Sequence, residues 1–313
     1  MFITSCERPI DSDYMDDGIP PSAPMGLGVY YASDGTIEIV WRTNPEKDVS
    51  HYLIERSIGD TSSFTILVST YSDYFIDDSL DYDKLYFYRI RAVDQTSLQS
   101  PFSSIVSARP VNRYKPQTPE GLLVLGRNWD TKQIYTAWKI SYETDISHYL
   151  LFRSNTSEFT PDSSNIIATL NGFEYYDTSA SILNSTYYYK LLAVDKGGLR
   201  SDVPAEGADV ILSKPEPVFP ADNSVIPVSF RFNIKAVGRP CTYKLVVQSS
   251  PAYGEIWSIS FFSDEVNDTI EVQPGLYYLE YGRRYYWQVF SYTGSEVVPN
   301  SASEVRSFIL RRN

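Results

Sequence analysis

Apolar and polar residues alternate along much of the chain with a period of two. Ile37, Ile39 and Trp41 alternate with polar or outward-facing neighbours, and the segment 86–92 follows the same pattern. This period, carried by β-branched and aromatic residues, is typical of strands that bury one face. No segment has an amphipathic pattern long enough for a helix, so the sequence predicts an all-β protein.

The strand patterns recur at a spacing of about 100 residues. DVSHYLIERS at 48–57 matches DISHYLLFRS at 145–154, and YFYRIRAVDQTSLQS at 86–100 matches YYYKLLAVDKGGLRS at 187–201. A fainter third copy, LEYGRRYYWQVFSY at 279–292, lacks the Asp-x-x-His-Tyr block. Several short strands in each repeat indicate that each unit is a β-sandwich.

Proline-rich segments mark the boundaries between the units: PPSAP at 20–24, ARPVNRYKPQTP at 108–119 and SKPEP at 213–217. Proline cannot donate a hydrogen bond to a strand ladder, so it suits strand ends and junctions. Three sandwiches in line would make a rod of roughly 100 Å, from the rise of about 3.3 Å per strand residue. The predicted divisions are a stalk at 1–21, domains at 22–110 and 111–213 (with a linker at 111–116), and a third domain at 214–313.

The repeated blocks resemble the fibronectin type III domain in its bacterial form. The matching pieces are PSAPMGLGV, IEIVW, DVSHYLIERS and YFYRIRAVDQTSLQS in the first unit, and TPEGLLVL, IYTAW, DISHYLLFRS and YYYKLLAVDKGGLRS in the second; together they cover residues 20–213. The resemblance implies three tandem immunoglobulin-like (fibronectin type III) β-sandwiches in an elongated array. The third unit, with Phe230 and Phe232 in place of a B-strand tryptophan, is a divergent relative.

Such sandwiches carry a tyrosine corner, which pairs an F-strand tyrosine with a leucine about six residues earlier. Leu80 with Tyr86 fits this pattern in the first unit, and Leu279 with Tyr285 fits it in the third. The second unit departs from the pattern, because Ser181 lies six residues before Tyr187. The sequence therefore leaves the corner of the second unit in question.

Charge and cysteine content narrow the classes of partner. The net charge is −12, and residues 1–110 carry 8 basic against 17 acidic side chains. Such a balance argues against nucleic-acid binding, which needs a positive field to recruit phosphates. With only Cys6 and Cys241, the domains must be held by packing rather than by disulfides. No run of about 20 apolar residues exists that would span a membrane.

His51 and His148 are the only histidines in the chain, and each stands three residues after an aspartate. One histidine and one aspartate are too few for a zinc site, and no activated nucleophile accompanies them. We interpret both as marks of the same strand position in two repeats. The sequence predicts no catalytic residue, no metal site and no cofactor.

Other carboxylate groups are candidates for acid–base and calcium chemistry. The pairs Asp77–Asp78 and Glu46–Asp48 are interpreted as solvated faces, because chance pairs are common among 39 acidic residues. The run DSDYMDDG at 11–18 resembles a calcium loop, but Met15 and Ser22 occupy ligand positions, so it is interpreted as an acidic stalk.

The sequence at 3–6, Ile-Thr-Ser-Cys, resembles the lipobox of bacterial lipoproteins, although the basic and apolar parts of a signal peptide do not precede it. The resemblance implies acylation of Cys6, a membrane contact through that lipid anchor alone, and a place in the bacterial cell envelope, at the outer membrane or cell surface and on the periplasmic or extracellular side. The alternative is a free thiol in a flexible tail.

Three aromatic residues outside the core pattern, expected in loops, are candidates for a binding surface: Trp129, Tyr253 and Trp257. The alternative for each is packing against a neighbouring domain or over the end of a sandwich. The favoured hypothesis is a non-enzymatic envelope lipoprotein that acts as a structural spacer and binds an unidentified protein partner. The alternative is a carbohydrate-binding or enzyme-accessory protein in which these aromatics stack on polysaccharide. A hydrolase with a site that the sequence does not reveal is the third and weakest hypothesis.

Overall fold

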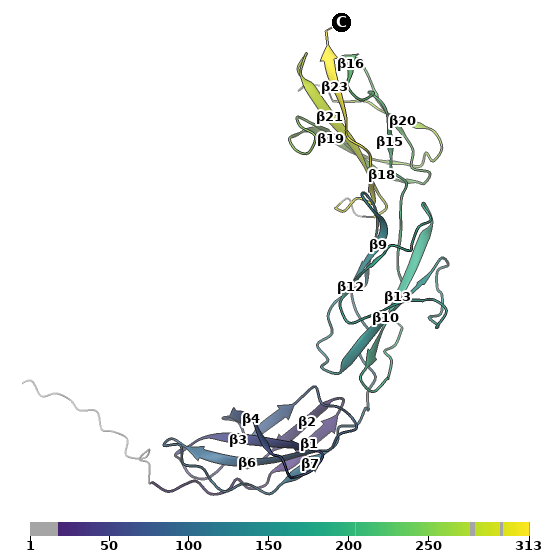
Figure 1. Cartoon of the computed structure of the whole chain (residues 1–313). Helices are drawn as coiled ribbons and strands as arrows, with labels where there is room; N and C mark the ends of the chain where they lie inside the picture. The colour runs from purple at the N-terminus through teal and green to yellow at the C-terminus, as the bar shows by residue number, and fades with distance from the viewer. Residues whose placement is uncertain (1–17, 204, 276–278, 295–296, 313) are drawn as a thin grey trace, which may run out of the picture. The chain divides into compact units, whose positions relative to one another are not determined.

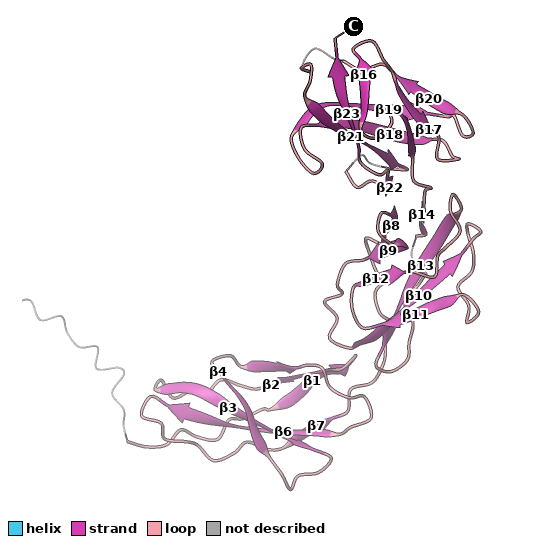
Figure 2. Cartoon of the chain, turned by 45° about the horizontal axis from the view of Figure 1, so that its top comes forward, coloured by secondary structure: helices cyan, strands magenta, loops and turns pink. Residues whose placement is uncertain are grey.

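The computed structural model describes residues 18–203, 205–275, 279–294 and 297–312. These residues form strands and connecting loops, and none of them lies in a helix (Figure 2). The described part of the chain accordingly has no helix of the length and apolarity needed to cross a bilayer. The strands form three immunoglobulin-like sandwiches in tandem, which confirms the predicted fold class (Figure 1). Their elongated arrangement stays a prediction.

The first sandwich has a three-stranded and a four-stranded sheet, both antiparallel. The smaller sheet has the order β1 (Gly28–Ser33), β2 (Thr36–Val40), β5 (Tyr74–Asp77). The larger sheet has the order β4 (Thr65–Thr70), β3 (Val49–Ile58), β6 (Tyr86–Asp94), β7 (Val106–Ala108).

The second sandwich repeats this arrangement. Its smaller sheet has the order β12 (Glu174–Asp177), β9 (Lys132–Ala137), β8 (Leu123–Asn128). Its larger sheet has the order β11 (Ile166–Leu170), β10 (Ile146–Ser154), β13 (Thr186–Asp195), β14 (Gly207–Val210).

The third sandwich keeps the plan with longer strands and one parallel pair. Its smaller sheet has the order β15 (Glu216–Phe219), β17 (Phe232–Lys235), β20 (Thr269–Val272). Its larger sheet has β19 (Glu255–Ser263), β18 (Cys241–Gln248), β21 (Arg284–Tyr292), β23 (Arg306–Arg311) and β16 (Ser224–Pro227), with β16 parallel to β23. The short β22 (Ser301–Ala302) pairs with β21 and also with β8 of the second sandwich.

Contacts between Cα atoms divide the chain into two compact units. The first unit holds the described residues up to Pro116 together with 142–147 and 194–201. The second unit holds 117–141, 148–193 and the chain from Asp202 onward, and so contains most of the second sandwich and all of the third. The predicted domain boundaries stay a prediction, but this division shows that the second and third sandwiches share contacts.

The core of the first sandwich follows directly from the period-two pattern. Ile37 and Ile39 on β2 pack against Ile54 on β3 and against Tyr88 and Ile90 on β6. All five side chains are buried, and their neighbours along each strand are less so. Burial of such apolar area is the main force that closes one sheet on the other.

A tyrosine corner closes all three sandwiches. The Tyr86 hydroxyl accepts the backbone N–H of Asp81 at 3.0 Å, and the Tyr187 hydroxyl accepts that of Ile182 at 2.8 Å. In the third sandwich the Tyr285 hydroxyl accepts the N–H of Glu280 at 2.7 Å. The donor is always the backbone five residues earlier, so the side chain at Ser181 does not prevent the bond. The second unit therefore has its corner despite the departure in its sequence.

A buried ion pair joins the two sheets in each of the first two sandwiches. In the first, Arg56 donates to both oxygens of Asp77, at 2.9 and 2.8 Å, and Tyr88 donates to the same carboxylate at 2.6 Å. In the second, Arg153 and Tyr189 donate to Asp177 at 2.6 and 2.8 Å. The interpretation of Asp77 as part of a solvated face was wrong, because its carboxylate is buried and fully engaged.

The third sandwich fills the corresponding place with apolar side chains. Trp287 lies on β21 as Tyr88 lies on β6, and it pairs with Val247 on β18 as Tyr88 pairs with Arg56. Val272 ends β20 as Asp77 ends β5. Val247, Val272 and Trp287 all belong to the core cluster of this sandwich. A buried ion pair and a well-packed apolar trio can be nearly equivalent in stability, which explains how one fold accepts both.

Loss of the Asp177 carboxylate should destabilise the second sandwich. Replacing Asp177 with Ala removes the carboxylate that accepts from the half-buried Arg153 and the buried Tyr189, at a cost of about 2–3 kcal/mol in the free energy of unfolding. Urea unfolding measures this cost, and Asp130→Ala, at an exposed turn position, is the matched control. A cost below about 0.5 kcal/mol would contradict this role of the carboxylate.

The same carboxylate should make stability depend on pH. Burial raises the pKa of Asp177, but hydrogen bonds from Ser179, Tyr189 and Arg153 outweigh burial and hold the pKa below its usual value. The contribution is therefore complete above the unfolded pKa of about 3.9 and is lost as pH falls through the lower folded pKa. Asp177→Asn should flatten the acid limb of the stability profile.

Candidate interaction surfaces

The histidine blocks lie at the start of β3 and β10, the C strands of the first two sandwiches, and the tyrosine of each block contacts the core. The Tyr52 hydroxyl accepts the backbone N–H of Asn44 at 2.8 Å, and its ring meets Trp41 edge-on with centroids 5.4 Å apart. His51, beside it, is half-buried, and its Nδ1 lies 3.3 Å from the Ser50 hydroxyl. A buried aromatic with a satisfied polar tip anchors the strand. The ring of His51 lies instead beside the exposed ring of Tyr71, with centroids 6.2 Å apart.

The second repeat has the same geometry. The Tyr149 hydroxyl accepts the N–H of Ser141 at 3.4 Å, and its ring meets Trp138 with centroids 5.5 Å apart. The aspartates of the two blocks bond through their backbone carbonyls, Asp48 with the N–H of Gln95 and Asp145 with the N–H of Lys196. No group of three or more potential metal ligands occurs among the residues that the structure describes.

The carboxylate of Glu46 also has a structural partner. Its Oε1 accepts the N–H of Ser22 at 2.8 Å and its Oε2 accepts the Asn44 amide at 3.2 Å. Burial raises the pKa of Glu46, but these hydrogen bonds outweigh burial and lower it. Glu46 thus connects the segment that enters the first sandwich, at Ser22, to the loop between β2 and β3.

The three predicted surface aromatics have different environments. Tyr253 is 73% exposed at the tip of the hairpin between β18 and β19, where its N–H is bonded to the Ser250 hydroxyl. Trp257 is not a loop residue: it lies on β19, packs against the core of the third sandwich and stacks on Phe232 with centroids 6.2 Å apart. Of these two, only Tyr253 has its ring free on the surface.

Trp129 belongs to a joint between the second and third sandwiches. It is 44% exposed, and its indole N–H donates to the carbonyl of Pro299 at 3.1 Å. Its own carbonyl accepts a hydrogen bond from Lys214. This aromatic therefore packs against a neighbouring domain, which was the alternative to ligand binding.

Asn300 is the central residue of the joint. Its buried side-chain amide donates to the carbonyls of Gly126 and Val210, both at 3.2 Å, and to the Asp209 carboxylate at 3.0 Å. Its carbonyl accepts the N–H of Asn128 at 2.6 Å. One residue of the third sandwich thereby bonds to two strands, β8 and β14, of the second.

Further bonds and apolar packing complete the joint. Asn128 donates to the carbonyl of Leu212 at 2.8 Å, and on the other side Asn184 donates to the carbonyl of Val237, also at 2.8 Å. Val210 and Leu212, at the end of the second sandwich, are members of the core cluster of the third. The hydrophobic core of the third sandwich thus continues into the joint, where these polar groups are hydrogen-bonded.

Gly126 permits the close approach of strands at this joint. A Cβ at this position would lie 1.9 Å from the carbonyl oxygen of Val210, which no side chain tolerates.

The repeats in the sequence did not single out Gly126 or Asn300, because neither residue belongs to a repeated block. Asp77 and Asp177 could have been recognised as equivalent residues of two repeats, because the segments YFID and EYYD end 100 residues apart.

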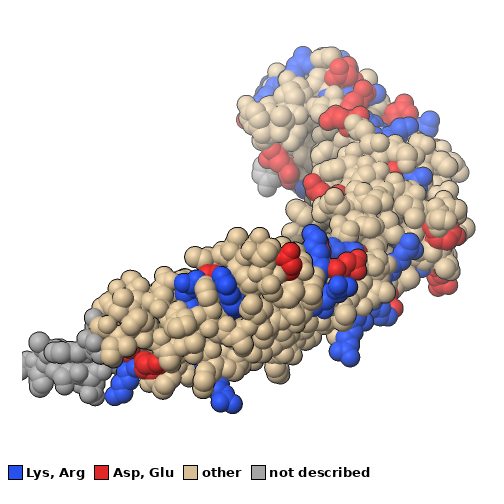
Figure 3. Space-filling model, turned by 60° about the horizontal axis from the view of Figure 1, so that its bottom comes forward, with Lys and Arg blue, Asp and Glu red and all other residues tan. Residues whose placement is uncertain are grey.

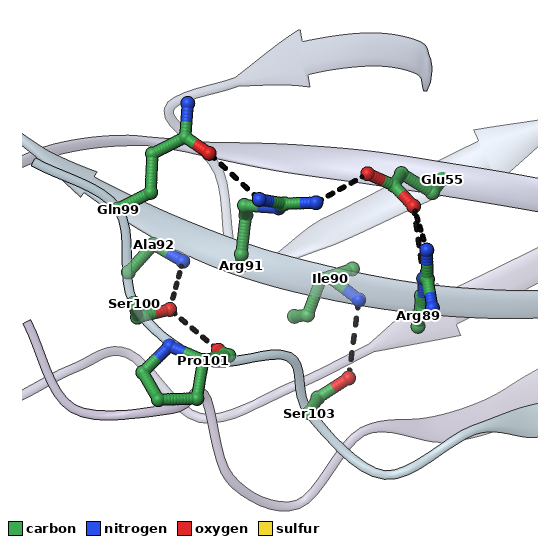
Figure 4. A network of polar contacts seen from close by, with 9 residues as sticks. All are labelled: Glu55, Arg89, Ile90, Arg91, Ala92, Gln99, Ser100, Pro101 and Ser103. Atoms are coloured by element: carbon green, nitrogen blue, oxygen red, sulfur yellow. Dashed lines mark hydrogen bonds and ion pairs between the residues drawn. The ribbon is translucent and has the colours of Figure 1, made fainter. Parts of the chain in front are cut away.

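A stack of arginine and phenylalanine covers the outer face of the larger sheet in the first sandwich. Glu55 on β3 accepts from Arg89 Nη2 at 2.6 Å and from Arg91 Nη2 at 2.7 Å (Figure 4). The guanidinium carbons of Arg89 and Arg91 lie 3.6 and 3.7 Å from the ring centroid of Phe102, and Phe64 contacts Arg89 at 4.2 Å. Two cations share one buried carboxylate, so the cluster carries a net positive charge.

The neighbouring segment supplies polar groups to the same region (Figure 4). Arg91 also donates to Gln99 at 2.7 Å, and the hydroxyls of Ser100 and Ser103 accept the N–H groups of Ala92 and Ile90. These serines satisfy backbone donors where β6 has no neighbouring strand. Arginine stacked on aromatic rings is a common component of protein interfaces.

The outer face of the smaller sheet in the second sandwich also presents aromatics. The rings of Tyr135 and Tyr176 lie with centroids 4.9 Å apart, tilted by 41°, and the guanidinium of Arg127 lies over the ring of Tyr135, 4.6 Å from its centroid. Tyr135 donates to Glu174 at 3.0 Å.

Figure 3 shows acidic and basic side chains scattered among uncharged ones on the face in view, without a broad patch of one sign.

The predicted acylation site, Cys6, lies outside the described residues, as does the acidic run at 11–17. Cys241, the other cysteine, is buried on β18, and burial raises the pKa of its thiol. A buried thiol of raised pKa is a poor nucleophile.

Comparisons with known proteins give likeness of fold without a family. No family model matches the chain. A crystal structure of the FN1–FN3 domains of chicken CNTN1 matches 93% of this chain and 99% of its own length, with 13% sequence identity and a TM-score of 0.38. A structure described as a myokine matches 30% of this chain and 99% of its own length, with 22% identity and a TM-score of 0.26. Both TM-scores are low, so the fold assignment rests on the strands and their pairing.

Proposed function

We propose that the protein is a non-enzymatic lipoprotein of the bacterial cell envelope that acts as a structural spacer and as a module for protein–protein interaction or adhesion. The observation that carries the spacer role is the joint at Asn300. Domains joined by a flexible linker would need no such set of buried hydrogen bonds. A joint that continues the core holds two domains at a fixed spacing.

The use of the repeated polar residues supports a non-enzymatic role. Asp77 and Asp177 bond to arginine and tyrosine within the sandwich, and the C-strand tyrosines bond to loop backbone. Groups so engaged are not free to move protons to and from a substrate. These residues therefore contribute to stability, and the proposed function lies at the surface.

Exposed apolar residues on open sheet faces support a protein partner. On the smaller sheet of the first sandwich, Tyr31, Tyr74 and Ile76 are exposed, and the register places Tyr31 and Ile76 on either side of Glu38. Tyrosine and arginine are enriched at interfaces because each offers a large contact area with a polar tip. The partner is a protein whose identity the surface does not specify.

Polysaccharide binding is the alternative function, and it now rests on Tyr253. Trp257 packs against the core and Trp129 donates its indole N–H to the third sandwich, whereas Tyr253 is 73% exposed. A single exposed tyrosine is a small platform for a sugar. The acidic net charge of −12 supports a protein without affinity for nucleic acid.

The proposed location depends on acylation of Cys6, which would anchor the protein to the outer membrane or cell surface, on the periplasmic or extracellular side. Acyl chains on one cysteine would give stable binding without a membrane-spanning segment. The acidic residues between Cys6 and Pro20 would hold the first sandwich away from the bilayer as a solvated tether.

Expression of the natural gene in a bacterial host fed an alkyne fatty acid tests the anchor. The wild-type protein should incorporate the label and sediment with membranes, and Cys6→Ser should do neither, because the acylated thiol is gone. Cys241→Ser, which removes the buried thiol, is the matched control and should keep the label. Equal labelling of wild type and Cys6→Ser would refute the lipoprotein proposal.

The spacer role is tested at Asn300. Asn300→Ala removes a buried amide whose N–H groups lie within hydrogen-bonding distance of three acceptors, and should cost about 2–4 kcal/mol in the unfolding of the second compact unit. The distance distribution between spin labels at the exposed positions Ser163→Cys and Ala252→Cys, in a Cys6→Ser background, should broaden. Asn155→Ala, at an exposed loop position, should leave it unchanged. An unchanged distribution in Asn300→Ala would contradict a joint held by this side chain.

A further inference from the structure

The strand β19 (Glu255–Ser263) is an open edge of the third sandwich. It ends the strand order of its sheet, and its ladder to β18 occupies only one of its two edges. No backbone group among the described residues bonds to the other edge. Such an edge offers a row of N–H and C=O groups to any strand that can pair with it.

This edge lacks the features that usually prevent pairing. Its sequence, EIWSISFFS, contains no proline and no lysine, and its one charged residue is the first. Apart from a register shift beside Glu255, its pairing with β18 is regular from Trp257 to Ser263. The equivalent edge strands of the other sandwiches, β4 and β11, have six and five residues, whereas β19 has nine.

The strand is also self-complementary in the antiparallel direction. If two copies pair with Ile259 opposite itself, Trp257 faces Phe261 and Ser258 faces Ser260. Large apolar residues thus meet large apolar residues and small hydroxyls meet small hydroxyls, which is the matching that stabilises cross-strand pairs.

The orientation of the side chains fits this register. Trp257, Ile259 and Phe261 pair with Val247, Leu245 and Tyr243 of β18, all of which face the core. Opposed residues of an antiparallel pair point to the same side, so a second copy would extend the apolar layer of one core into the other. Ile259 is 36% exposed and Phe262 is 67% exposed, so both have apolar surface left to bury.

We propose that two copies of this chain associate through β19, antiparallel and centred on Ile259, to form one continuous sheet across a two-fold axis. An isologous contact of this kind is closed, because each copy uses the same edge on the other. One strand pair buries less area than a standard interface, so the dimer is expected to be weak and concentration-dependent. This inference goes beyond the proposed function and does not depend on the lipid anchor.

Charge substitutions on the outer face of β19 test both the dimer and its register. In the centred register, residue 258 of one copy lies opposite residue 260 of the other. Ser258→Lys with Ser260→Lys therefore places like charges opposite each other twice, and should weaken the dimer by about tenfold or more. Ser258→Lys with Ser260→Glu places opposite charges there and should keep the dimer at or above wild-type strength, as should Ser258→Glu with Ser260→Lys.

Sedimentation equilibrium on the full chain, up to about 1 mM because such interfaces are weak, measures the association. Circular dichroism and thermal unfolding of each variant establish that it is folded. A wild-type protein that stays monomeric throughout, or a double-lysine variant that associates as wild type does, overturns the proposal. Association lost in the double-lysine variant and equally lost in both opposite-charge variants overturns the centred register.

Discussion

The three sandwiches depend on tyrosine hydroxyls that accept backbone N–H groups where the chain enters or leaves a strand. A loop donor that is covered by a core and left unbonded costs about 1–3 kcal/mol, and water cannot reach it. Tyrosine solves this by burying its ring in the core while its hydroxyl reaches the loop. The corner residues are Tyr86, Tyr187 and Tyr285, and the C-strand residues are Tyr52, Tyr149 and Tyr243.

Around this shared frame, the cores use two different chemistries. The first two sandwiches place an arginine, an aspartate and a tyrosine between their sheets, and the third places Val247, Val272 and Trp287 there. The frame is therefore the constant element and the core filling is the variable one. The joint at Asn300 also uses a side chain to satisfy buried backbone groups, here between two domains. The Asn300 amide donates to the carbonyls of Gly126 and Val210, which the continued core covers.

The alternation of apolar and polar residues and the repeat of about 100 residues were sufficient to predict the all-β sandwiches. The alternation is visible within each strand, and the same strand patterns occur in two successive units. The corner of the second unit was left in question because its donor is a backbone N–H, which the side chain at position 181 does not reveal. Trp257 was placed in a loop because SSPAYGEIWSIS contains turn residues only in its first half. Asn300 and the edge of β19 were not predictable, since both depend on which strands become neighbours.

The central claim is that the tyrosines of the repeated blocks, rather than the histidines beside them, hold these strands in the sandwich. The free energies of unfolding of Tyr52→Phe and His51→Ala test it most directly, since the two residues are adjacent on β3. Tyr52→Phe keeps the ring but removes the acceptor for Asn44, and should cost about 1–2 kcal/mol. His51→Ala should cost less than about 0.5 kcal/mol. The reverse order, with histidine the costlier loss, would contradict the account.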